Sequence, residues 1–130
     1  MRIMLDTNVL ISAFVFRSMN ELIKKITDNH IIVLCSYVID EMHSVVERKF
    51  PTKAINLEEF LERLPFELIY TPQIIVKQDL FTIRDINDEK VLYSAIMADA
   101  DVLITGDKDF SDIDIERPEI LTPGEFLEKY

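Results

Sequence analysis

Short apolar runs alternate with longer amphipathic stretches along the whole chain. The runs have the length of strands, and the stretches repeat apolar residues at helical spacing. This alternation is typical of an α/β protein with a parallel sheet. We expect strands at 3–5, 31–35, 67–70, 102–105 and 119–121, helices at 9–16, 18–28, 36–49, 57–64, 87–98 and after 122, and a loop at 71–84.

Local signals mark where two of the expected helices begin. Ser36 is expected to cap the helix that runs to residue 49. The terminal helix has a stronger signal, because Thr122 and Glu125 form a capping box with Pro123 at the first helical position. We therefore expect this last helix to begin at Pro123.

Length and composition indicate a single globular domain. At 130 residues we expect one domain over 1–130, and a hydrophobic share of 48% is enough for its core. No apolar run approaches the roughly 20 residues that span a bilayer. The acid at position 6 comes too early for a secretory signal, so we expect a cytoplasmic protein without membrane contact. The lone Cys35 lies in an apolar run and is expected to be a buried thiol.

The net charge of −10 argues against a broad phosphate-binding surface, because Lys and Arg make the contacts with nucleic-acid backbones. It leaves a local site open, since carboxylates that hold divalent cations can present positive charge on an acidic protein. Most of the 24 acids must form a solvated surface. The informative acids are those that the predicted fold brings together.

Four acids are expected near one edge of the sheet. Asp6 directly follows the first strand and Asp107 follows the fourth, and open parallel sheets bind ligands at the carboxyl ends of their strands. Glu41 lies at the border of the apolar stripe of its helix, and Asp88 lies at the centre of the buried face of the helix at 87–98. Taken singly, Asp6 could be a helix cap and Asp88 could be satisfied by N–H groups of the first turn. Together the four acids favour a shared cation.

The expected acid cluster offers only oxygen ligands. Such ligands, without Cys or His, select Mg²⁺ or Mn²⁺ rather than zinc or copper. A divalent ion removes the repulsion among crowded carboxylates. It can also lower the pKa of a bound water, which then attacks a phosphodiester. This chemistry needs no Ser/His/Asp or Cys/His arrangement, and the sequence predicts none.

Four ordered motifs resemble those of the PIN-domain family. They span essentially the whole chain, and four in order are far more specific than any one alone. They read LDTNVLIS at 5–12, SYVIDEM at 36–42, RDINDEKVL at 84–92 and ADVLITGDKDF at 100–110. The last two most resemble the VapC-like branch, which contains toxins of toxin–antitoxin pairs.

The resemblance implies a three-layer α/β/α fold with a central parallel sheet of about five strands. It also implies Mg²⁺- or Mn²⁺-dependent cleavage of RNA, a cognate antitoxin as partner, and a homodimer. The resemblance assigns catalytic and metal-binding roles to four acids and supporting roles to four further residues. The acids are Asp6, Glu41, Asp88 and Asp107; in support, Asn8 would position Asp6 or substrate, Thr105 would order the acids by hydrogen bonding, and Asp85 and Asp109 are second-line candidates.

Other classes of protein remain as alternatives. A PIN fold that binds a partner without cutting RNA is one, although the presence of all four acids argues against it. An acidic receiver-like signalling domain would need paired acids after the first strand and an acceptor Asp after the third. Asp6 has no adjacent acid, and 67–71 contains no Asp. A haloacid-dehalogenase-like phosphatase would need an Asp where Asn8 stands.

Overall fold

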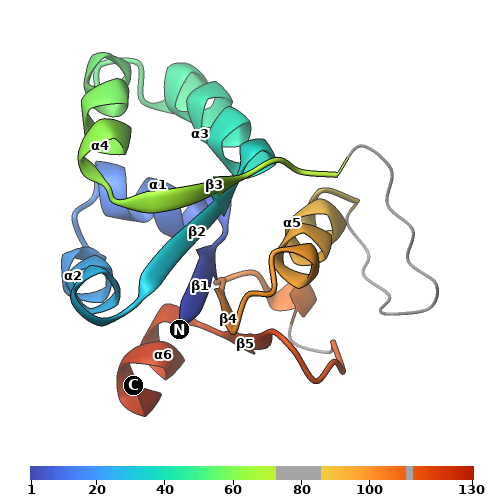
Figure 1. The fold of residues 1–130 in the computed structure, drawn as a ribbon. Helices are drawn as coiled ribbons and strands as arrows, with labels where there is room; N and C mark the ends of the chain where they lie inside the picture. Colours follow the sequence, from blue (N-terminus) through green and yellow to red (C-terminus); the bar gives the residue numbers. More distant parts are fainter. Residues whose placement is uncertain (73–85, 111–112) are drawn as a thin grey trace.

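The computed structural model describes residues 1–72, 86–110 and 113–130, and in these ranges a five-stranded sheet forms the centre of the molecule (Figure 1). All pairings are parallel, and the strand order is β3-β2-β1-β4-β5. This confirms the predicted parallel sheet. The strands are β1 (Arg2–Leu5), β2 (Ile31–Cys35), β3 (Phe66–Ile69), β4 (Val102–Ile104) and β5 (Glu119–Leu121).

Helices cover both faces of the sheet, which confirms the three-layer α/β/α architecture. In Figure 1, α1, α2 and α4 lie on one side of the strands and α5 lies on the other. α3 contacts both α1 and α5. The helices are α1 (Thr7–Val15), α2 (Asn20–Asn29), α3 (Ser36–Lys49), α4 (Leu57–Arg63), α5 (Ile86–Met97) and α6 (Pro123–Lys129), with short 3₁₀ helices η1 (Ala54–Asn56) and η2 (Lys108–Phe110).

The core is built on the three inner strands. Ile3 of β1 pairs with Ile32 of β2 on one side and with Val102 of β4 on the other, and all three side chains are buried. Burying an aliphatic side chain of this size contributes about 1.5–3 kcal/mol. Because a strand covered on both faces has no solvated side, these segments are apolar at nearly every position. The same packing buries Cys35 completely, as predicted.

The capping box of the terminal helix is confirmed. The backbone N–H of Glu125 donates to Thr122 Oγ1 at 3.1 Å, and the N–H of Thr122 donates to Glu125 Oε1 at 2.9 Å. The predicted cap of α3 is wrong. The N-cap residue is Cys35, because the helix continues directly from β2, and Ser36 is already its first residue. Its hydroxyl instead accepts a hydrogen bond from the N–H of Thr71, at 2.9 Å.

Several element boundaries differ from the expectation by one or two residues, and two of these differences have a clear cause. β3 ends at Ile69, because its pairing with β2 ends where Cys35 gives way to α3, and Tyr70 beyond it is exposed. α1 begins at Thr7, two residues early, because Asp6 caps it. Most of the predicted loop at 71–84 lies outside the described residues. None of the helices in the described ranges is long and apolar enough to span a bilayer.

Candidate metal centre

The first element of the site is Asp6, which directly follows β1 and caps α1. Its backbone N–H donates to the carbonyl of Ile104 at 3.1 Å, so the residue is held beside the end of β4. Its side chain accepts a hydrogen bond from the N–H of Val9 at 3.2 Å and another from the hydroxyl of Thr105. Only 6% of Asp6 is exposed.

Burial raises the pKa of the Asp6 carboxyl above its usual range. Hydrogen bonds from Thr105 and from the backbone N–H groups of Val9 and Asn8 oppose this shift, and the nearby charge of Asp107 adds to it. The charged form of Asp6 therefore depends on hydrogen-bond donors that only partly offset its burial. A bound cation would offset the remainder.

A chain of hydrogen bonds organises the acids after β4. The hydroxyl of Thr105, which donates to Asp6, accepts from the N–H of Asp107 at 3.0 Å. Asp107 Oδ1 in turn accepts from the N–H of Asp109 at 2.9 Å. One threonine thus joins the acid at the end of β1 to the acids in the loop after β4.

Three carboxylates, from α5, from the loop after β4 and from η2, lie close enough together to hold a metal ion. One oxygen each of Asp88, Asp107 and Asp109 lies within 4.8 Å of the others. Asp88 stands in the first turn of α5 and is half-buried rather than fully buried, because the first turn of α5 opens onto a cleft. Asp109, expected only as a supporting residue, joins Asp107 and Asp88 directly.

That cleft has a volume of about 200 Å³ and contains all four acids expected at the site. Asn8 lies at its exposed rim, and Thr105 lies behind Asp6 and Asp107. Asp85 lies outside the described residues. The cleft is lined by Asp6, Thr7, Asn8, Glu41, Val45, Asn87, Asp88, Val91 and Asp107.

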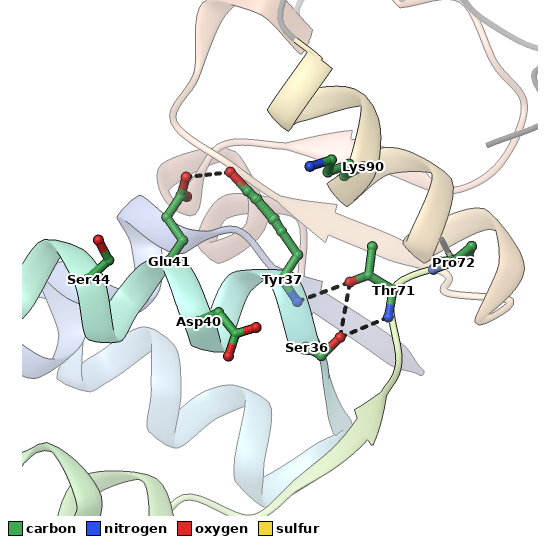
Figure 2. Close-up of a pocket in the computed structure, with 8 residues that line it drawn as sticks. All are labelled: Ser36, Tyr37, Asp40, Glu41, Ser44, Thr71, Pro72 and Lys90. Atoms are coloured by element: carbon green, nitrogen blue, oxygen red, sulfur yellow. Dashed lines mark hydrogen bonds between the residues drawn. The ribbon is translucent and has the colours of Figure 1, made fainter. Parts of the chain in front are cut away.

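Glu41 reaches the cleft from α3 and is held by a neighbour that the sequence did not single out. The hydroxyl of Tyr37 donates to Glu41 Oε2 at 2.6 Å (Figure 2). The two residues are four apart on one helix, a spacing that places side chains together, and this signal could have identified Tyr37. The ring of Tyr37 lies 5.0 Å from the ammonium of Lys90 on α5.

The donor set fits a hard divalent cation. Within the described ranges, none of the carboxylates of Asp6, Glu41, Asp107 and Asp109 forms an ion pair with Lys or Arg. The buried hydroxyl oxygen of Thr7, which also lines the cleft, has no hydrogen-bond partner among these residues. A cation with ordered waters would satisfy both the carboxylates and this hydroxyl.

Comparison with known proteins gives a family and a fold. The model of the PIN domain matches residues 2–109. A solved structure, VapBC2 from Rickettsia felis bound to a DNA fragment from their promoter, is similar with a TM-score of 0.68 and 23% identity, covering 93% of this chain and 97% of that one. No curated protein matches the chain. With the family model matched over most of its length, the chain belongs to the PIN-domain family.

Proposed function

We propose that this protein is a metal-dependent endoribonuclease and the toxin of a type II toxin–antitoxin pair. The main supporting observation is that carboxylates from four parts of the chain line one cleft: the end of β1, α3, α5 and the loop after β4. Among the described residues that line this cleft, none is Lys or Arg. Asp6, Glu41, Asp88 and Asp107 would hold Mg²⁺ or Mn²⁺, with Asp109 beside them.

The protein's own contribution is to hold these oxygens in place before the substrate arrives. Thr105 fixes the relative position of Asp6 and Asp107, and Tyr37 restrains one oxygen of Glu41. A divalent cation bound there supplies Lewis-acid chemistry, acidifying a water and offsetting charge on the phosphate. Because such ligands are already ordered, the free energy of activation does not include the cost of arranging them.

The toxin assignment has separate support. PIN-domain membership covers residues 2–109, and the similar fold of VapBC2 is described in complex with DNA from a promoter. We propose a cognate antitoxin and a homodimer on this basis. Co-expression with the product of the adjacent gene, followed by size-exclusion chromatography with light scattering, tests both. A monomer that never co-purifies with that product would reject the toxin assignment.

The nuclease assignment is tested with purified protein and labelled single-stranded and structured RNA. We expect cleavage with Mg²⁺ or Mn²⁺, none with EDTA, and none after Asp6→Asn. Asp28→Asn, which removes an exposed acid on α2, is the matched control and should retain activity. Cleavage that ignores chelation would reject the mechanism. A wild-type protein that cuts no RNA but binds a partner tightly would instead be a non-cleaving interaction module.

A further inference from the structure

A second hollow, whose lining residues are drawn in Figure 2, shares Glu41 with the acidic cleft. Its volume is about 510 Å³, within the roughly 300–1,000 Å³ of ordinary small-molecule sites. We call it the Lys90 pocket. It is lined by Ser36, Tyr37, Asp40, Glu41, Ser44, Thr71, Pro72 and Lys90, which come from α3, from α5 and from the segment after β3.

Lys90 is the positively charged residue of this pocket, whose lining also contains the carboxylates of Asp40 and Glu41. It is the one cationic side chain among the described residues that line either hollow. Its ammonium forms no ion pair with an acid in the part of the chain that the structure describes. It rests instead near the ring of Tyr37, a contact that leaves its hydrogen-bond donors available. An anionic group entering the pocket would meet a positive charge that no acid has neutralised.

The wall opposite Lys90 is held by hydrogen bonds. Thr71 Oγ1 accepts from the N–H of Tyr37 at 3.0 Å and from the hydroxyl of Ser36 at 3.4 Å, and the N–H of Thr71 donates to Ser36 Oγ at 2.9 Å. These bonds join the start of α3 to Thr71, two residues beyond β3, as Figure 2 shows. The pocket is therefore formed before any ligand enters, which reduces the entropy cost of binding.

Tyr37 connects the pocket to the acidic cleft. Its hydroxyl donates to Glu41 at 2.6 Å, while its ring contacts the ammonium of Lys90. A phosphate bound by Lys90 would thus be separated from the Glu41 carboxylate of the candidate metal centre by the side chain of Tyr37. Adjacent phosphates of one RNA strand could occupy the two hollows together.

We propose that the Lys90 pocket binds the nucleotide next to the cleaved bond of single-stranded RNA, with the Lys90 ammonium on its phosphate. This inference rests on the proposed nuclease function. One cation fits one phosphate, and the exposed carboxylate of Asp40 on the pocket's lining would repel a second. A duplex would require contacts with many phosphates along both strands, which this acidic surface does not offer.

Binding of a fluorescein-labelled single-stranded RNA octamer, measured by anisotropy in EDTA where cleavage is blocked, tests the pocket. Lys90→Ala should weaken binding about tenfold and reduce the salt dependence of log K by about 0.7. Lys90→Arg should retain most of the affinity, because it keeps the charge. Lys24→Ala, which removes an exposed lysine of α2, is the matched control and should bind like wild type.

Kinetics in Mg²⁺ separate this inference from the function on which it rests. Lys90→Ala should raise KM about tenfold and leave kcat within about twofold. If Lys90→Ala binds and cleaves RNA like wild type, the pocket is not a nucleotide site, although the nuclease function is supported. If RNA binding depends on Lys90 but the wild-type protein cleaves no RNA, the nuclease function is rejected and the pocket proposal is supported. Equal Lys90 dependence for an RNA duplex would overturn the single-strand assignment.

Discussion

The two edges of the sheet, where the strands begin (the amino edge) and where they end (the carboxyl edge), differ in how their acidic side chains are neutralised. At the amino edge, Arg2 donates to both oxygens of Glu67, at 2.8 and 3.0 Å, and Arg117 pairs with Asp101 at 2.6 Å. At the carboxyl edge, Asp6 lies close to other carboxylates, and the hydrogen bonds that it receives within the described ranges come from a hydroxyl and from backbone N–H groups. Both edges belong to the same five strands.

The pKa values of the acids are shifted in opposite directions at the two edges. Hydrogen bonding by Arg2 lowers the pKa of Glu67, and the backbone N–H of Arg2 lowers that of Asp101. At the other edge, burial raises the pKa of Asp6. At the amino edge the chain itself supplies the positive charge, whereas at the carboxyl edge the proposed cation would supply it. Ion pairing, more than the number of acids, therefore distinguishes a structural edge from a candidate metal centre.

The sharpest test of the comparison substitutes one acid at each edge. Asp107→Asn should lower kcat by about a hundredfold or more, because it removes a carboxylate that the proposed mechanism assigns to the cation. Glu67→Gln should leave kcat within about twofold, since Glu67 pairs with Arg2 at the amino edge and does not line the acidic cleft. Single-turnover cleavage of a labelled RNA measures both. Equal losses at the two edges would contradict the distinction.

Magnesium should stabilise the carboxyl edge in particular. At a free concentration about 100 times the dissociation constant, an ion that binds only the folded state adds about 2.7 kcal/mol, which raises Tm by about 10 °C. Asp88→Asn should reduce this rise, and Glu67→Gln should not. Thermal unfolding followed by circular dichroism, with and without Mg²⁺, measures the effect. An unchanged magnesium response in Asp88→Asn would remove Asp88 from the ligand set.

Tyr37 should act on the two hollows through different parts of its side chain. Tyr37→Phe removes the hydroxyl that holds Glu41 and should lower kcat about tenfold with KM unchanged, as loss of a supporting hydrogen bond typically does. Tyr37→Leu also removes the ring beneath Lys90 and should raise KM as well. Steady-state kinetics on one RNA substrate distinguish the two variants. A change in KM alone for Tyr37→Phe would contradict the assigned role of the hydroxyl.

The smallest expected effect concerns the pH dependence of the metal-free protein. Because the pKa of Asp6 is higher in the folded state, unfolding releases a proton between the unfolded value of 3.8 and the folded value. Stability from this group is therefore lost as pH rises through that window. In EDTA, Asp6→Asn should show a weaker fall of Tm over the same window. Parallel Tm curves for the two proteins would contradict a buried, desolvated Asp6.

The order of strands and helices, and the sheet edge at which Asp6 and Asp107 lie, could be predicted from the sequence. These features follow from apolar periodicity and from the rule that parallel strands share one carboxyl edge. The capping box at Thr122 was equally predictable, because all of its partners lie within three residues. The spacing of these residues in the sequence is sufficient to predict such a local motif.

Other contacts near that edge became visible only in the folded protein. Ser36 bonds to Thr71 rather than capping its own helix, and Lys90 approaches Tyr37 from another helix. These partners lie tens of residues apart in the chain. These contacts depend on the orientation of each side chain and on the path of each loop. Neither produces a periodic pattern in the sequence, so neither could be predicted from it.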